Sequence, residues 1–230
     1  MKKIILAALL STTALSATAY ENSNGKDFYA QVNAGYAQGV KPGKSYNGKM
    51  GNSAIIGLEA GYNVNNNFRT SLSIDYNPNF KAERNAKNGI YYGKNIDVAY
   101  TADPISTKVK SFVTMINLYG DITNYNGFTP YVMAGVGIAR NKTKTTFYSA
   151  TVLGSSNNGS IEGATKTNAA FKIGFGTKYS VNNDVDLDIH YQYVDAGKFN
   201  TGTKEVLGKS FKGEGKIRSN QVLVGAAYKF

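Results

Sequence analysis

The chain contains a single histidine, His190, the side chain best suited to proton transfer near neutral pH. It lies in the segment HYQ beside Gln192, and no nucleophile accompanies it at a spacing that indicates catalysis. The chain has no cysteine, and its carboxylates are scattered without the spacing of a zinc site. The GVG and GFG segments lie within apolar runs rather than before a helix, so they do not indicate phosphate-binding loops. We therefore predict a structural role for His190, and neither enzymatic activity nor a metal nor a cofactor.

The residues around His190 indicate the kind of element that positions it. In VDLDIHYQY, at residues 185–193, apolar and aromatic residues alternate with Asp186, Asp188, His190 and Gln192. A period of two is the pattern of a strand with one apolar face. The same alternation occurs, least regularly in the third, at residues 54–62, 68–76, 112–118, 132–138, 171–179, 222–230 and 28–36. These segments predict an all-β chain with eight strands.

Short and long connections alternate between the predicted strands. Residues 63–67, 123–128 and 180–184 are short and rich in turn-forming residues, whereas the other four connections are long and polar. Compact soluble domains seldom contain such long connections without secondary structure. The asymmetry is typical of outer-membrane barrels. We predict an eight-stranded antiparallel transmembrane up-and-down β-barrel with short periplasmic turns and four long extracellular loops.

A water-soluble β-sandwich or a lipocalin-like barrel would also contain alternating strands. Two features favour the membrane barrel instead. The opposite faces of the strands are too polar for the packed interior of a sandwich. The apolar faces begin or end in aromatic residues, as lipid interfaces require, at Phe28, Tyr36, Tyr62, Phe68, Tyr76, Tyr179, Tyr193, Tyr228 and Phe230.

The first residues, MKKIILAALLSTTALSATAY, have the composition of a secretory signal peptide. Two lysines precede a short apolar run, and Ala17-Thr18-Ala19 forms a small-residue cleavage site. The apolar run is far shorter than a membrane-spanning helix requires. We predict a cleaved signal peptide at residues 1–19 and one barrel domain at residues 20–230.

The last segment, SNQVLVGAAYKF, alternates up to Phe230 and predicts a strand that pairs with the first strand to close a barrel. It resembles the signal, carried by Tyr228 and Phe230, that the outer-membrane assembly machinery recognises. Together with PYVMAGVGIA and HYQYVDAG, it makes the whole mature chain resemble the eight-stranded opacity-like and OmpA-type barrels, most closely the small surface adhesins of rickettsial bacteria. The resemblance implies a multi-pass monomer in the bacterial outer membrane, in contact with its lipid and lipopolysaccharide, with loops exposed at the cell surface.

The alternation places charged side chains of both signs inside the barrel. An interior of eight strands is just wide enough for side chains to fill, and a buried charge without a partner is costly. We expect Glu59 to reach Arg69 diagonally and Lys178 to lie opposite Asp186. The alternative is a conducting pore lined by these groups. The predicted interior polar network comprises Glu59, Arg69, Asp75, Lys172, Lys178, Asp186, Asp188 and His190.

The formal net charge is +11, and each of the four predicted loops is net basic. Such charges suit an acidic partner, although the same lysines could simply be solvated and pair with lipopolysaccharide phosphates. Tyrosines beside basic residues are favoured at protein interfaces. The predicted partner-binding residues are Lys41, Lys44, Lys49, Lys81, Arg84, Lys87, Tyr91, Tyr92, Lys94, Tyr100, Lys142, Lys144, Phe147, Tyr148, Lys198, Lys204, Lys209 and Lys212.

These features lead to a functional prediction that rests on the resemblance. We expect a surface adhesin that binds a host-cell or host-serum protein through its basic, tyrosine-containing loops. The second loop, at residues 78–104, is the best candidate for the binding segment because it is long and rich in aromatic residues. The alternatives are a narrow porin and a purely structural envelope protein. No nucleic-acid partner is expected.

Overall fold

The structure is a computed structural model. It describes residues 27–41, 48–84, 105–147, 159–200, 204–206, 209–211 and 214–230. The predicted signal peptide at residues 1–19 lies outside these ranges.

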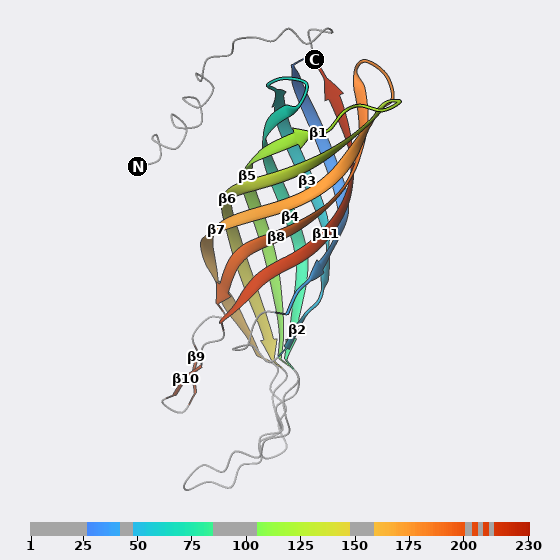
Figure 1. Cartoon of the computed structure of the whole chain (residues 1–230). Coiled ribbons are helices and arrows are strands. Elements are labelled where there is room, and N and C mark those ends of the chain that lie inside the picture. The colour runs from blue at the N-terminus through green and yellow to red at the C-terminus, as the bar shows by residue number, and fades with distance from the viewer. Residues whose placement is uncertain are drawn as a thin grey trace, which may run out of the picture.

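The described residues form one closed antiparallel barrel of eight long strands (Figure 1), as the sequence predicts. Three short strands accompany them: β2 pairs with the far end of β4, while β9 and β10 form a separate hairpin. The strands are β1 (Phe28–Gly39), β2 (Gly48–Met50), β3 (Asn52–Asn63), β4 (Phe68–Arg84), β5 (Ile105–Asp121), β6 (Phe128–Phe147), β7 (Gly159–Ser180), β8 (Val185–Asn200), β9 (Lys204–Val206), β10 (Lys209–Phe211) and β11 (Glu214–Lys229).

The first and last strands close the barrel. Strand β1 pairs with β11 from Tyr29 opposite Lys229 to Gly39 opposite Ser219. Beyond this ladder, the backbone N–H of Phe230 donates to the carbonyl of Phe28 at 2.9 Å. The predicted place of Phe230 is confirmed, because it is tied to the first strand at the barrel end that carries the short turns (Figure 1). We call this the turn end and the opposite one the loop end.

The short turns are tighter than predicted, and this changes the register. Asn65 Oδ1 accepts hydrogen bonds from the backbone N–H groups of Asn67 and Phe68, and Asn182 makes the equivalent pair of bonds in the β7–β8 turn. Such local bonds to an asparagine side chain are a standard way of stabilising a turn. As a result Tyr62 lies opposite Thr70 and Tyr179 opposite Leu187, two residues away from the predicted partners.

The third short turn follows the prediction from its Asn-Gly pair. Asn126 and Gly127 have φ angles of 50° and 85°, and the backbone groups of Tyr125 and Phe128 bond to each other across them. Two consecutive positive φ angles define the hairpin turn that Asn-Gly favours. Residues 122–127 therefore connect β5 and β6, with the two-residue Asn126-Gly127 turn at the tip.

The outer wall of the barrel is apolar over a broad band. The predicted apolar faces point outward, including the least regular one in β5, where Leu118 is 64% exposed; Val136 in β6 is 68% exposed. Aromatic pairs border the band, with Phe128 and Tyr179 at the turn end and Tyr76 and Phe112 towards the loop end. Among the described residues, no helix is long and apolar enough to cross a membrane.

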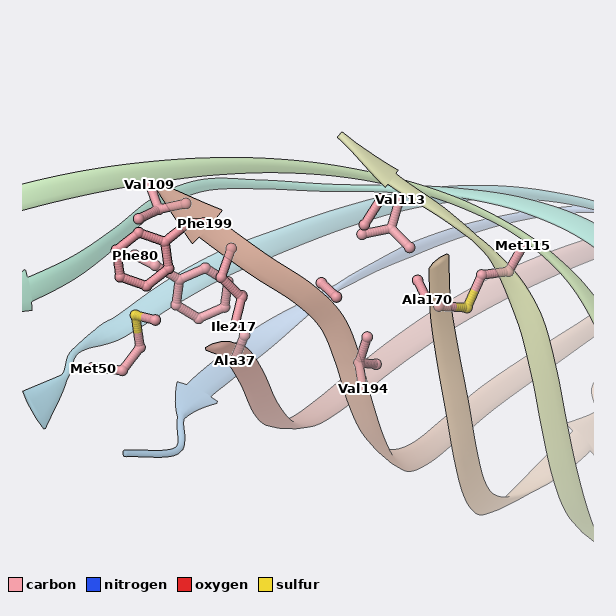
Figure 2. Packing of buried hydrophobic residues seen from close by; sticks show 12 residues of the cluster. Ala37, Met50, Phe80, Val109, Val113, Met115, Ala170, Val194, Phe199 and Ile217 are labelled. Atoms are coloured by element: carbon pink, nitrogen blue, oxygen red, sulfur yellow. The ribbon is translucent and has the colours of Figure 1, made fainter. Parts of the chain in front are cut away.

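The interior changes character along the barrel. At the turn end it is polar, as predicted, but towards the loop end it contains an apolar cluster that the sequence analysis did not predict (Figure 2). We call this cluster the apolar plug; it comprises Ala37, Met50, Phe80, Val109, Val113, Met115, Ala139, Ala170, Val194, Ala196, Phe199 and Ile217. The strands also continue well into segments that were predicted to be loops, with β4 reaching Arg84 and β5 starting at Ile105.

Candidate functional site

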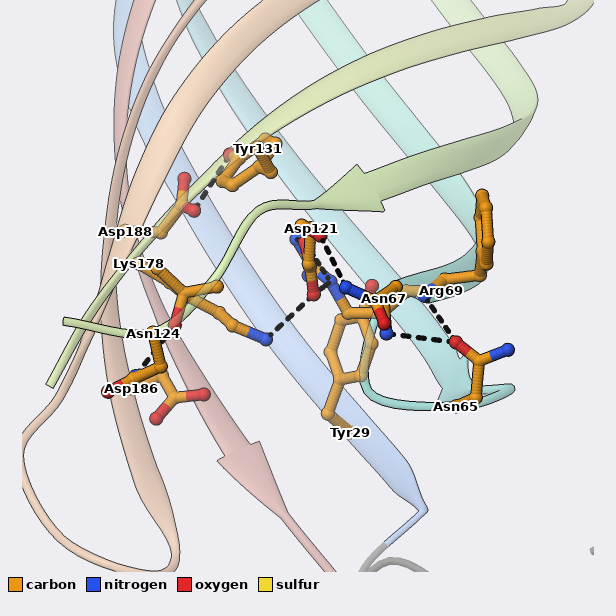
Figure 3. A network of polar contacts seen from close by, with 12 residues as sticks. Tyr29, Asn65, Asn67, Arg69, Asp121, Asn124, Tyr131, Lys178, Asp186 and Asp188 are labelled. Carbon is orange, nitrogen blue, oxygen red and sulfur yellow. Dashed lines mark hydrogen bonds and ion pairs between the residues drawn. The ribbon is translucent and has the colours of Figure 1, made fainter. Parts of the chain in front are cut away.

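The strongest charge cluster of the bore joins β4, β5 and β7 near the turn end (Figure 3). Arg69 binds Asp121 through two nitrogens, with Nε–Oδ2 at 2.8 Å and Nη2–Oδ1 at 2.9 Å. Lys178 Nζ lies 3.0 Å from the same carboxylate. Asp121 is not among the predicted interior residues, because the prediction for this strand rested on its apolar face alone. The odd-numbered residues Val113, Met115 and Tyr119 of the same strand are buried, and Asp121 continues this inward-facing series. That alternation is the sequence signal that points to Asp121 as an interior residue.

Three tyrosines surround Arg69 and provide hydrogen bonds to buried carboxylates. The Arg69 guanidinium lies 4.4 Å from the ring centre of Tyr119 and 5.0 Å from that of Tyr131, distances typical of cation–π contacts. The hydroxyls of Tyr119 and Tyr29 both donate to Glu59 at 2.8 Å. Aromatic side chains therefore occupy the bore at the level of the charge cluster.

The two predicted charge pairs are wrong in detail because of the tighter turns. Arg69 lies opposite Asn63 and pairs with Asp121, while Glu59 lies opposite Ser73 and accepts from tyrosines. Lys178 lies opposite Asp188 rather than Asp186, and its ammonium binds Asp121. A register shift of two residues keeps each side chain on its predicted face but exchanges its neighbours.

The remaining predicted interior residues also lie inside the barrel with a partner. Asp186 binds Lys229 at 2.8 Å, and the Lys172 ammonium lies 3.8 Å from Asp75. His190 Nδ1 contacts Asp188, whose other oxygen accepts a hydrogen bond from the Tyr131 hydroxyl. His190 thus contacts a carboxylate of its own strand, β8, and that carboxylate is in turn bonded to Tyr131 of β6; the structural role of His190 stays a prediction. Within the described residues, no group of three potential metal ligands occurs.

A polar cavity of about 190 Å³ remains at the turn end. Its lining contains three cations and three carboxylates; all three cations are in the close pairs described above, with the carboxylates of Asp121 and Asp186. Gly61 makes room for the Tyr29 ring beside this cavity, because a Cβ atom at Gly61 would lie 2.1 Å from Tyr29 Cζ. Farther along the bore the apolar plug alternates with buried polar side chains, such as Ser111, which donates to Asn141 at 2.7 Å. Among the described residues, the interior is thus a network of paired charges and packed side chains.

The predicted partner-binding residues divide into three groups. Lys41, Lys81, Lys142, Lys144 and Lys198 are exposed. Lys49, Arg84, Phe147, Lys204 and Lys209 lie in strands β2, β4, β6, β9 and β10, but their side chains are not described. Outside the described residues lie Lys44, Lys87, Tyr91, Tyr92, Lys94, Tyr100, Tyr148 and Lys212.

Many of these residues are therefore not loop residues, which corrects the predicted loop boundaries. Lys81 and Arg84 belong to β4, Lys142 and Lys144 to β6, and Lys198 to β8. The backbone groups of these segments are paired with neighbouring strands, for example Lys81 opposite Lys108. The barrel wall thus extends past the apolar band, and it exposes basic side chains there.

A closed barrel with an apolar outer band and a polar interior at the same level is stable only where the outside is lipid. The fold therefore defines a transmembrane β-barrel of the outer-membrane type, with the turn end on the periplasmic side and the loop end outside the cell. Residues 7–230 match the family model described as "Outer membrane protein beta-barrel domain", and the chain belongs to this family. It is an outer-membrane protein.

Relatives match over most of the chain. The outer membrane protein PagN of Salmonella typhimurium is 30% identical over 76% of this chain and 72% of its own. Two relatives that carry the name "Putative adhesin" are 31% identical over 86% of this chain and 85% of theirs, in Rickettsia canadensis, and 30% identical over 99% of both chains, in Rickettsia typhi. The crystal structure of Neisserial surface protein A has the same fold, with a TM-score of 0.51, 19% identity and coverage of 88% of this chain and 97% of that one.

Proposed function

We propose that this outer-membrane protein is a non-enzymatic surface adhesin, and that its loop end attaches the bacterium to a host-cell or host-serum protein. The observation that carries the proposal is the filled interior. The inward cations pair with Asp121, Asp186 and Asp75, Glu59 accepts from tyrosines, and the apolar plug lies in the bore beyond them. A bore occupied by side chains in this way is poorly suited to conduct a solute, and we therefore assign the binding function to the surface at the loop end.

The exposed chemistry at the loop end is basic. Lys41, Lys81, Lys142, Lys144 and Lys198 all expose their side chains there, and such a surface attracts acidic patches on a partner and accelerates the encounter. The relatives named as adhesins in two Rickettsia species support the proposal because they match almost the full length of the barrel. Adhesion through the predicted tyrosines of the second loop remains part of the proposal.

The test is attachment to host cells of a non-adherent bacterium that displays the protein. Strands β4 and β5 continue to Arg84 and from Ile105, so the replacement should cover residues 85–104 only, with a short Gly/Ser connection. A matched control replaces residues 148–158, between β6 and β7, in the same way. Surface display and barrel formation are checked in each variant by antibody labelling and by the mobility shift on heating.

If replacement of residues 85–104 abolishes attachment and replacement of residues 148–158 preserves it, the result supports an adhesin that binds through its second loop. Attachment lost equally in both variants would favour a diffuse charge effect over a defined binding segment. If the folded wild-type protein gives no attachment at all, adhesion is refuted. Single-channel recording in a planar bilayer and envelope integrity of a deletion strain would then distinguish a porin from a structural protein.

Two further parts of the proposal concern the membrane side. We expect the assembly machinery to recognise the last strand through Tyr228 and Phe230, whose side chains are exposed on the lipid-facing side. We expect a monomer, because the closed β1–β11 ladder leaves no free edge in the barrel sheet for a second copy.

A further inference from the structure

A band of basic side chains crosses the outer wall of three adjacent strands, β4, β5 and β6, on the loop side of the apolar band. All of them are exposed. Within the described residues, none of them forms an ion pair with an acidic side chain. We call this band the basic wall patch; it comprises Lys81, Lys108, Lys110, Arg140, Lys142 and Lys144.

The strand register places these like charges directly opposite one another. Lys108 lies between Lys81 on β4 and Lys144 on β6, and Lys110 lies opposite Lys142. The Cβ atoms of directly opposite residues are roughly 5 Å apart, and like charges in such positions destabilise a sheet. Two acidic residues border the patch in the ladder, Glu162 opposite Lys144 and Glu83 two residues beyond Lys81 on β4. The centre of the patch therefore lacks an acidic neighbour in the register and is suited to an external anion.

The height of the basic wall patch relative to the membrane indicates which kind of anion it binds. Arg140 lies directly opposite Phe112, whose ring packs against Tyr76 at the border of the apolar band. Lys110 and Lys142 follow two residue pairs farther out, roughly 7 Å along the strands. Aromatic residues at this border mark the level of the lipid headgroups. The patch thus begins where the phosphates of the outer leaflet lie.

The outward residues near the loop-side border of the apolar band are uncharged on three other strands, namely Gln38 of β1, Asn52 opposite it on β3, and Thr167 of β7, which lies opposite Arg140. The exposed lysines of β8 and β11, Lys198 and Lys216, lie farther from the band. A general attraction to water or to salt would not require this clustering. The patch also faces sideways from the barrel wall rather than along its axis, which suits a neighbour in the membrane better than a soluble polyanion approaching from above.

We propose that the basic wall patch binds the phosphate groups of an anionic glycolipid of the outer leaflet. Lys110, Lys142 and Arg140 form its centre, and the phosphates neutralise the like charges that the sheet brings together. This site shares Lys81, Lys142 and Lys144 with the basic surface of the proposed adhesin, but it binds a lipid of the protein's own membrane rather than a host partner. It would persist if adhesion were refuted, and its own failure would leave the adhesin proposal intact.

The test uses diphosphoryl lipid A as the probe, added to the full protein purified from outer membranes in an uncharged detergent, with binding measured by native mass spectrometry. The variant Lys110→Gln/Lys142→Gln removes the central pair without changing any buried side chain. The matched control is Lys198→Gln/Lys216→Gln, which removes another exposed, directly opposite lysine pair. That pair lies on β8 and β11, well beyond the last lipid-facing residues Tyr193 and Val222, and so above the phosphate level.

We expect Lys110→Gln/Lys142→Gln to weaken lipid A binding about thirtyfold, since a basic residue near an anionic lipid surface contributes about a factor of five. The control pair should change binding less than about threefold. Wild-type binding should also fall when the probe is lipid A without phosphates. Equal losses in the two variants, or equal binding of phosphate-free lipid A, would overturn the site.

Two further experiments distinguish a lipid headgroup from a soluble anion as the ligand. Inorganic phosphate should compete only weakly, because it lacks the acyl chains that place the headgroup at the wall. The lipid proposal would be overturned in favour of a soluble polyanion by one result. In that result heparin binds the wild-type protein but not the Lys110/Lys142 variant, while the two proteins bind lipid A equally.

Urea unfolding adds a measurement that does not depend on binding. Without lipid A, the Lys110/Lys142 variant should be at least as stable as wild type, because it lacks the repulsion between the two lysines. A large loss of stability would contradict the like-charge argument.

Discussion

Replacement of Asp121 by asparagine should destabilise the barrel more than any other single charge removal in the bore. The carboxylate is 2% exposed and binds both the 6% exposed Arg69 and Lys178, so Asp121→Asn leaves a buried guanidinium without its counter-ion. Removal of one partner of a buried ion pair costs about 3–5 kcal/mol. Lys178 is 20% exposed and can turn towards water, so it should add little to this loss.

The free energy of unfolding should therefore fall by about 3–5 kcal/mol in Asp121→Asn, measured by urea titration of protein folded into phospholipid vesicles. The chain has no tryptophan, so the folded fraction is better followed by the mobility shift on heating than by intrinsic fluorescence. The matched control is Asp186→Asn, whose partner Lys229 is 19% exposed and can recover hydration. Its loss should be clearly smaller.

A double variant tests the cause of the effect. Arg69→Met/Asp121→Asn removes the unpaired guanidinium together with the carboxylate, so it should be more stable than Asp121→Asn alone, even though the ring contacts of Arg69 are lost. A loss below about 1 kcal/mol in Asp121→Asn, or a double variant less stable than the single one, would refute the reasoning.

Four further variants probe other parts of the interior. Tyr119→Phe removes a hydroxyl that donates to buried Glu59 and should lower the free energy of unfolding by about 1–3 kcal/mol, with Tyr29→Phe giving a comparable loss in the same urea titration. Gly61→Ala places a Cβ atom against the Tyr29 ring and should cost about 1–3 kcal/mol by overpacking; a thermal melt that matches wild type would contradict this packing. Phe199→Ala should cost about 3–5 kcal/mol through a cavity in the apolar plug, and its unchanged stability would mean that the plug contributes nothing to folding.

The alternation of residues was sufficient to predict the barrel, the number of its long strands and the direction of nearly every side chain within the membrane. It could not fix the register, because a shift of two residues leaves every face unchanged. The deciding contacts were those of Asn65 and Asn182 with the backbone of their own turns. A period of two contains no information about such local bonds, so the partners of Arg69 and Lys178 were mispredicted.

The ends of the strands were missed for a different reason. Within the membrane the apolar residues face outward, but beyond Phe112 the exposed residues are Lys110 and Lys108 while Val109 is buried. The alternation continues with the opposite polarity, because the surroundings change from lipid to water. In β4 a bulge between Asn77 and Phe80 also shifts the pattern and turns Phe80 inward. Exposed lysines were therefore interpreted as loop residues.

The strands continue beyond the lipid, and their length sets how far the barrel wall projects from the membrane. Strand β7 has 22 residues. At roughly 3.3 Å per residue and a tilt of about 40°, it covers about 55 Å along the barrel axis, whereas the hydrocarbon layer is about 30 Å thick. The rigid wall thus raises the loop attachments on the order of 20 Å above the bilayer. The loop end of β7 is therefore reached from the aqueous side of the membrane rather than through the lipid.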